Sequence, residues 1–303
     1  MRHTSLGRAA VLLAVLLAGP GRAAAGPPAV AADLPPLDAA TSLLVVAPHP
    51  DDETLCCAGV MQRVVAAGGH VSVVWVTSGD ASELDLLLLE HSLFMRAGAA
   101  RDLATRRMRE ARAATALLGV PSAGQLFLGY PDRGVLQLLT AHRTQPYASP
   151  FSGAAAVPYA QALYPRHPYT GASLEQDFAA VLERVHPTLI LAPTPLDSHP
   201  DHRAAGLLTA TVAQHLQLLP AVRYWIVHGG EGWPGPRGLV PGLPLTPAPR
   251  LHGLVPAVFA LTPAEEDRKQ QAIEAYATQM RITAPFLLSF VRSSELFTTA
   301  AQP

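Results

Sequence analysis

The segment Ser42-Leu-Leu-Val-Val-Ala47, which runs directly into Pro48-His49-Pro50-Asp51-Asp52-Glu53, gives the first indication of the fold. A short, fully apolar run that contains β-branched residues is typical of a strand buried on both faces, as in a parallel sheet. We expect a helix to follow from Glu53 to Ala67, because Gly68-Gly69 provides a stop signal. The order of strand, polar turn and helix predicts the first half of a βαβ unit.

The same alternation continues along the chain. We expect further buried strands at 71–76, 125–128, 188–192 and 222–227, and helices at 101–118, 174–185, 201–216 and from the capping box Thr262-Pro263-Ala264-Glu265 to about Tyr276. Ser173 is the expected cap of the helix that begins at Leu174. This pattern predicts an α/β fold, a Rossmann-like and mostly parallel sheet with helices on both faces. Only 129–171 and 229–249 break the rhythm, as long loops.

Composition excludes two broad classes of protein. Of the 303 residues, 49% are apolar and 15% are charged, whereas a disordered chain is rich in charge and poor in apolar residues. The formal net charge is −1 and no basic stripe is visible in the sequence, which argues against a nucleic-acid-binding protein.

The N-terminus has the layout of a secretory signal peptide. Arg2, His3 and Arg8 precede an apolar run at 9–18, which is shorter than the roughly 20 residues of a membrane span. Ala23-Ala24-Ala25 then provides a small-x-small cleavage signal. We therefore expect a signal peptide at 1–25, a Pro/Ala-rich linker at 26–40 and a single domain at 41–303. The mature protein is expected to be periplasmic or extracellular with no stable membrane span; an uncleaved anchor is the alternative.

Two clusters of His and Asp follow predicted strands. The first is the Pro48–Glu53 segment, and the second is Pro195-Leu196-Asp197-Ser198-His199-Pro200-Asp201-His202. Ligands of open α/β sheets bind at the carboxyl ends of the strands. The two clusters can therefore converge on one site. Taken singly, each has a plainer interpretation, as charge that complements a helix dipole or as a surface turn.

The residue types indicate a catalytic metal. Imidazole with carboxylate and no thiolate suits a divalent ion such as Zn²⁺, which uses three protein ligands in catalytic sites. His49 and Asp52 are three residues apart and can face one point, and a His of the second cluster would complete the set. Asp51 must then point elsewhere, where it can act as a general base. Of His199 and His202, one can ligate while the other faces the substrate.

Five motifs in order resemble the LmbE-like, or PIG-L, family of deacetylases. They are Val46-Ala47-Pro48-His49-Pro50-Asp51-Asp52-Glu53-Thr54-Leu55, Thr77-Ser78-Gly79-Asp80, Arg107-Met108-Arg109-Glu110 ahead of Leu118-Gly119-Val120, Leu128-Gly129-Tyr130-Pro131-Asp132-Arg133-Gly134, and His199-Pro200-Asp201-His202. The resemblance covers about residues 42–205, while the last hundred residues have no counterpart in it.

The resemblance implies a role for each matching residue. His49, Asp52 and His202 would hold one zinc ion, and Asp51 would be the general base. His199 would polarise the amide carbonyl or, as imidazolium, stabilise the oxyanion. Asp201 would orient a neighbouring His. Asp80, Arg107 and Asp132 would contact sugar hydroxyls. The family fold is the Rossmann-like sheet already expected.

The chain departs from the family pattern at two points. Some members place a Tyr shortly before the second signature, where it helps to hold the oxyanion; here Leu196-Asp197-Ser198 stands instead. Tyr130, Tyr159, Tyr164 or Tyr169 of the long loop could substitute. Cys56-Cys57 replaces a common Gly-Cys, and we interpret the pair as buried small apolar residues rather than as a redox or metal site.

These observations predict an exported zinc hydrolase that removes acetyl from an N-acetylated sugar or glycolipid. Two alternatives remain open. One is the same chemistry on a non-sugar acylated amine, and the other is a non-catalytic carbohydrate-binding protein. The sequence does not indicate the oligomeric state.

Overall fold

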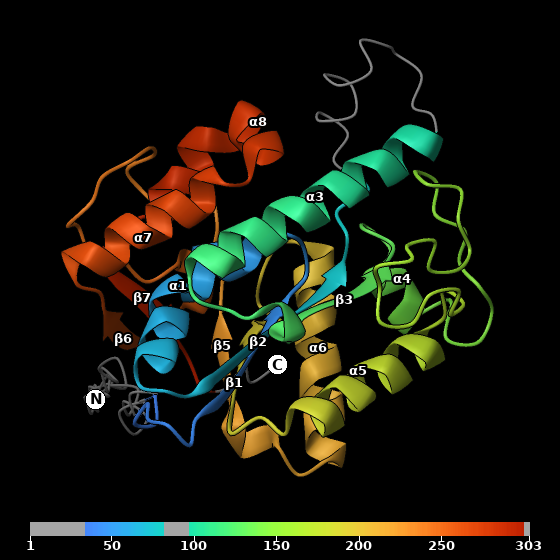
Figure 1. Cartoon of the computed structure of the whole chain (residues 1–303), viewed down its shortest axis with the longest axis horizontal. Coiled ribbons are helices and arrows are strands. Elements are labelled where there is room, and N and C mark those ends of the chain that lie inside the picture. Colours follow the sequence, from blue (N-terminus) through green and yellow to red (C-terminus); the bar gives the residue numbers. More distant parts are fainter. Residues whose placement is uncertain (1–33, 82–96, 300–303) are drawn as a thin grey trace, which may run out of the picture. The chain divides into compact units, whose positions relative to one another are not determined.

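The computed structural model describes residues 34–81 and 97–299, and within them five strands form one parallel sheet of the order β3-β2-β1-β4-β5 (Figure 1). The strands are β1 (Ser42–Ala47), β2 (His70–Thr77), β3 (Gln125–Tyr130), β4 (Leu189–Pro193) and β5 (Val222–Trp225). Nearly all their residues are buried, as continuous apolar runs require. The predicted fold class is confirmed.

Helices cover both faces of this sheet (Figure 1). On one face lie α1 (Asp52–Ala66) and α3 (Ala97–Leu117), with α7 (Pro263–Glu274) packed on both. On the other lie α5 (Gly171–Val185) and α6 (Pro200–His215), with the short α4 (Val135–Leu139) against them. Because the chain moves outward in opposite directions from β1 and from β4, right-handed crossovers place the two sets of helices on opposite faces.

The strand order positions the site. The sheet winds one way through β1, β2 and β3 and the other way through β4 and β5. The crevice between the carboxyl ends of β1 and β4 is the switch point at which ligands bind in such sheets. The two His/Asp clusters directly follow these two strands.

Helix starts depend on local hydroxyl groups, and one expected cap is wrong. The α5 helix begins at Gly171, three residues before Leu174, and its N-cap is Thr170 instead of Ser173. The Thr170 hydroxyl accepts the backbone N–H of Ser173 at 3.1 Å. At α7 the capping box of Thr262 and Glu265 is present as predicted.

The C-terminal part contains elements that the sequence did not suggest. They are α8 (Ala277–Leu287) and an antiparallel pair of strands, β6 (Ala257–Ala260) and β7 (Ser294–Phe297). A bridge from Thr298 to Tyr224 joins this part to β5. Short 3₁₀ turns lie at Ser122–Gly124, Leu219–Ala221, Pro249–Leu251 and Leu288–Phe290.

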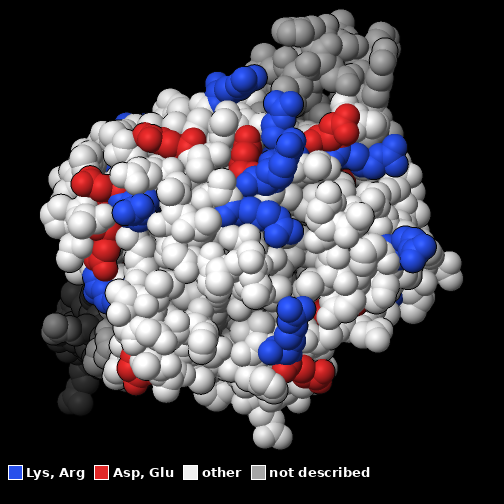
Figure 2. Space-filling model, in the orientation of Figure 1, with Lys and Arg blue, Asp and Glu red and all other residues white. Residues whose placement is uncertain are grey.

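Two further features bear on the N-terminal and surface expectations. The signal-peptide segment lies outside the described residues, whereas Leu34 and Leu37 of the predicted linker pack against the core. Within 34–81 and 97–299, no helix combines the length and apolarity needed to cross a membrane. The α3 helix exposes Arg101, Arg106 and Arg109, and Figure 2 shows positive charge over this helix with acidic groups interspersed.

Candidate active site

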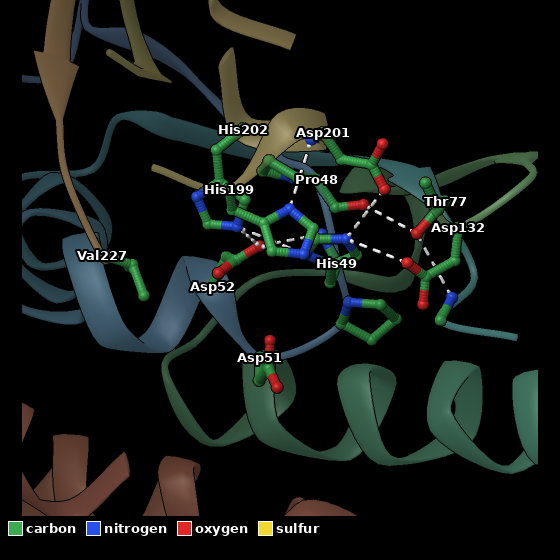
Figure 3. A network of polar contacts seen from close by, with 12 residues as sticks. Pro48, His49, Asp51, Asp52, Thr77, Asp132, His199, Asp201, His202 and Val227 are labelled. Atoms are coloured by element: carbon green, nitrogen blue, oxygen red, sulfur yellow. Dashed lines mark hydrogen bonds and ion pairs between the residues drawn. The ribbon is translucent and has the colours of Figure 1, made fainter. Parts of the chain in front are cut away.

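The turns after β1 and β4 bring the two predicted clusters together, although 153 residues separate His49 from His202 (Figure 3). The Nδ1 atom of His49 lies 3.3 Å from Asp52 Oδ2 and 3.3 Å from His202 Nε2. The Asp52 oxygen lies 3.2 Å from the same His202 nitrogen. Three potential ligand atoms therefore form a nearly equilateral triangle.

The size of this triangle fits a tetrahedral metal ion. Bonds of about 2.0–2.2 Å to nitrogen and oxygen place the ligands of tetrahedral zinc roughly 3.3–3.5 Å apart. The three side chains are buried, and the backbone N–H of His49 fixes the Asp52 carboxylate at 2.9 Å. The donor set and its spacing thus suit the ion that the sequence predicted.

Carboxylates hold the ring nitrogens that face away from the triangle. His202 Nδ1 lies 3.2 Å from Asp197 Oδ2, and His49 Nε2 lies 3.3 Å from both Asp201 Oδ2 and Asp132 Oδ1. Asp201 also accepts the backbone N–H groups of Arg133 and Val135 at 2.6 and 3.1 Å. Such partners select the tautomer and orientation of a metal-binding His.

Other groupings of these side chains are also close enough to hold an ion. They are His49 with His199 and His202, Asp197 with His202 and His228, and His49 with Asp132 and Asp201. We favour the triangle of His49, Asp52 and His202, because its edges of 3.2–3.3 Å match the ligand spacing of tetrahedral zinc. In addition, Asp197 and Asp201 each accept two or more backbone N–H groups, whereas Asp52 accepts one.

The charges around the triangle also favour a cation. Burial opposes protonation of His202, but Asp52 and Asp197 outweigh it and raise the pKa of His202 to about 10. Burial likewise opposes charge on Asp52, yet His202 and His49 hold the pKa of that carboxyl well below its usual range. A metal ion would therefore displace protons from the imidazoles, so metal affinity should fall as pH falls.

Asp51 lies apart from this network (Figure 3). Its backbone φ is 144°, a value that L-residues seldom adopt, and its side chain does not cap α1. The carboxylate lies on the cavity wall, 3.2 Å from Arg107 Nη2. Burial raises the pKa of Asp51 to about 7, although the Arg107 guanidinium opposes the shift. The adjacent carboxylates thus differ in direction and in proton affinity.

His199 is the N-cap residue of α6 and lines the same cavity. Its Nδ1 accepts the backbone N–H of Asp201 at 3.2 Å. Burial and the neighbouring imidazoles lower the pKa of His199 to about 2. The neutral ring therefore carries its proton on Nε2, which makes that atom a hydrogen-bond donor.

The cavity has a volume of about 220 Å³ and is lined by both polar and apolar side chains. The polar ones include Arg107, Asp132 and Arg133, and the apolar ones include Leu55, Val227, Phe286 and Leu287. Arg107 also binds the carbonyl oxygens of Pro50 and Gly79, and a Cβ at Gly79, where φ is +70°, would collide with the guanidinium. Two of the three predicted sugar contacts, Arg107 and Asp132, thus reach the cavity.

Asp80, the third, is buried behind the wall. Its carboxylate accepts the backbone N–H of Asp132 at 3.0 Å and the Tyr159 hydroxyl at 3.2 Å. Asp80 therefore supports the loop of Asp132 instead of lining the cavity. Its place behind the cavity wall could not be predicted from the motif, because it depends on how the loops of Asp80 and Asp132 pack against each other.

The four tyrosines considered as oxyanion donors do not line the cavity. The hydroxyls of Tyr130, Tyr159 and Tyr169 donate to Asp177, Asp80 and the Gly129 carbonyl, respectively, and Tyr164 stacks on His167. These tyrosines therefore serve packing within the loop and against the elements beside it.

Sequence reasoning missed several cavity residues. His228 follows β5, and its ring centroid lies 5.2 Å from that of His199 and 5.8 Å from that of Phe286. Burial and nearby His202 lower the pKa of His228 to about 4. Its place after a strand was a usable signal. No pattern pointed to Gln279, Thr283, Phe286 and Leu287 of α8.

Cys56 and Cys57 lie in α1 and are buried, as expected. A disulfide bond joins them, which the interpretation as buried small apolar residues did not include.

Comparison with known proteins agrees with the motifs. The profile of the family "PIG-L: GlcNAc-PI de-N-acetylase" matches residues 44–213. A 1D-myo-inositol 2-acetamido-2-deoxy-alpha-D-glucopyranoside deacetylase of Kribbella flavida is 29% identical over 293 residues, covering 84% of this chain and 88% of that protein. The protein of the same name in Actinosynnema mirum is 32% identical over 182 residues, covering 58% of this chain and 56% of its own.

Solved structures share the fold. The deacetylase of the A40926 pseudoaglycone superposes with a TM-score of 0.56 at 21% identity, covering 86% of this chain and 99% of that one. The N,N'-diacetylchitobiose deacetylase of Pyrococcus horikoshii gives a TM-score of 0.52 at 19% identity, covering 84% and 82%.

Proposed function

The chain belongs to the GlcNAc-PI de-N-acetylase (PIG-L) family of N-deacetylases, and from this premise we propose that it is a zinc-dependent hydrolase that removes acetyl from an N-acetylated sugar. The observation that supports a metal ion is the triangle of His49, Asp52 and His202, whose ligand atoms lie 3.2–3.3 Å apart. An ion held there supplies Lewis acidity, which polarises the acyl oxygen and makes water a stronger acid.

Asp51 is the proposed general base. It reaches the cavity without entering the ligand triangle, and its raised pKa suits proton transfer near neutral pH. The carboxylate takes the proton of the attacking water. It can then return this proton to the leaving amine, which departs as the free amino sugar while the acyl group leaves as acetate.

His199 is the proposed partner of the acyl oxygen. Because its Nδ1 accepts a backbone N–H, a neutral His199 donates through Nε2, and it stabilises the developing oxyanion as a hydrogen-bond donor. We add His228 as a second donor, since its ring faces His199 in the cavity and the loop tyrosines are engaged elsewhere. Asp201 and Asp197 orient His49 and His202.

The substrate is proposed from the cavity and from the names of relatives. Arg107 and Asp132 line the cavity and suit hydrogen bonds to sugar hydroxyls. Relatives are named for an acetamido-glucopyranoside of inositol, and structural neighbours for diacetylchitobiose and the A40926 pseudoaglycone. Another acylated amine remains the alternative, because a different leaving amine would leave the metal ligands unchanged.

Acetate release from a panel of substrates tests the proposal. The panel contains a GlcNAc–inositol glycoside, diacetylchitobiose, an N-acetylated glycolipid and an N-acetylated peptide, each with protein stripped of metal and reloaded with one Zn²⁺ per chain. We expect release from at least one sugar only after reloading. Equal acetate release by the stripped protein would overturn the proposed zinc dependence. Acetate release from the peptide alone would overturn the proposal that the substrate is a sugar.

We also propose that the protein is exported, on the basis of its N-terminal sequence. Amino-terminal sequencing of protein from the cell envelope of the source organism should give a start near Gly26. Protein that begins at Met1 and stays in the cytoplasm would contradict this.

A further inference from the structure

The direction of the Asp51 side chain depends on an unusual backbone conformation. Asp51 and Asp52 are adjacent, yet Asp52 joins the ligand triangle and Asp51 faces Arg107. The chain achieves this with a φ of 144° at Asp51, which a non-glycine residue rarely adopts. Such a conformation persists only where surrounding contacts hold it.

Glu53 supplies one of those contacts. Its side chain is fully buried at the start of α1, and Oε2 accepts the backbone N–H of Asp51 at 3.2 Å. The same oxygen accepts Trp75 Nε1 at 2.9 Å, and Oε1 accepts the hydroxyl of Tyr276. The carboxylate therefore connects the backbone of Asp51 to two large, buried side chains.

Tyr276 comes from a part of the chain that lies outside the family match at 44–213. It sits between α7 and α8, 223 residues from Glu53, and is completely buried. The same C-terminal part of the chain also contacts the backbone of α1 at Leu55 and Gly59. Lys269 Nζ donates to the Leu55 carbonyl at 2.8 Å, and Glu295 accepts the backbone N–H of Gly59 at 2.9 Å. Of these three contacts, that of Tyr276 is the one made with Glu53, whose carboxylate accepts the backbone N–H of Asp51.

We propose that Glu53 and Tyr276 are positioning residues for the general base. This inference rests on the proposed role of Asp51. Tyr276 fixes the Glu53 carboxylate, Glu53 fixes the backbone N–H of Asp51, and the Asp51 carboxylate is thereby held in the cavity. The metal ligand Asp52 does not need this connection, because the backbone N–H of His49 holds it separately.

The first test is Tyr276→Phe, which removes one hydroxyl and keeps the ring. A 1 Å misplacement of a catalytic group can cost about 10²-fold in rate, so we expect kcat to fall roughly 10- to 100-fold. KM and zinc content should stay at wild-type values. Thr278→Val is the matched control, at a position two residues after Tyr276. It removes a buried hydroxyl that donates to Glu110 at 2.6 Å, and it should leave kcat unchanged.

A double-mutant cycle then separates positioning from general damage. In an Asp51→Asn background there is no base to position, so adding Tyr276→Phe should cause no further loss of kcat. An equal loss in both backgrounds would assign Tyr276 a merely structural role and overturn the inference. Glu53→Gln, whose amide oxygen can still accept the Asp51 N–H, should retain more activity than Glu53→Ala at equal zinc content.

The two levels of proposal fail differently. If Asp51→Asn keeps wild-type turnover, Asp51 is not the base and the proposed mechanism fails. If Asp51→Asn is impaired but Tyr276→Phe turns over like wild type, the proposed mechanism stands and only the positioning role is overturned.

Discussion

The strand-end turns after β1 and β4 and the C-terminal part from β5 onward contribute to the same cavity in different ways. The turns supply the ligand triangle, Asp51 and His199, all within residues 49–202. The C-terminal part supplies His228, the cavity-lining residues of α8 and the buried contacts of Tyr276 and Lys269 with α1. The difference suggests that the turns determine the reaction, whereas the C-terminal part shapes and steadies the place where it happens.

The largest expected effects lie in the first turn. Asp51→Asn should keep zinc and lose about 10²–10⁴-fold in kcat, the usual size of general acid–base catalysis. Asp52→Asn removes a charge from the ligand triangle, so it should lower zinc affinity, and excess zinc should restore part of its activity. Metal analysis and turnover measured with increasing zinc check both variants. If excess zinc rescues Asp51→Asn instead, the two carboxylates have exchanged roles.

His228→Ala tests whether the C-terminal part also contributes to chemistry. Removal of one oxyanion donor typically costs about 10²–10³-fold in kcat, and we expect a loss toward the lower end, because His199 remains. Zinc content should not change. Phe286→Leu, which keeps an apolar wall beside His228, is the control and should alter KM more than kcat. A wild-type kcat in His228→Ala would confine the chemistry to the strand-end turns.

The pH profile tests the electrostatics of the base. Asp51 acts as a carboxylate, so kcat should fall as pH drops below its pKa, which burial raises to about 7. A bound cation would move this acidic limb to lower pH. Arg107 favours the carboxylate, and an opposite charge is worth about 1–3 pKa units, so Arg107→Gln should move the limb to higher pH by about that amount. If the acidic limb of the kcat profile does not move in Arg107→Gln, a group other than Asp51 determines its pH.

The smallest effect is expected from Thr262→Ala, at the capping box of α7. Loss of an N-cap costs about 0.5–2 kcal/mol, which thermal or denaturant unfolding can measure. Activity at 25 °C should not change, since the cap is exposed and far along α7 from Tyr276. A large loss of kcat would mean that the position of α7 is critical for the site.

Much of the fold and the reactive groups could be predicted from the sequence alone. Buried parallel strands have continuous apolar sequences such as residues 42–47. The segments that follow these strands contain the His and Asp residues. Because parallel strands end at one edge of a sheet, local pattern was enough to predict that His49 and Asp52 meet a His of the second cluster, and the family resemblance singled out His202.

The tertiary structure alone decided what surrounds those groups. The position of Asp80 behind Asp132, the place of His228 beside His199, the α8 residues at the cavity and the bond from Tyr276 to Glu53 join segments 29 to 223 residues apart in sequence. Each of these residues is ordinary in its own segment. Contacts of this kind depend on how whole helices and loops pack, which no local periodicity records, so the reactive groups could be read from the chain and their positioning could not.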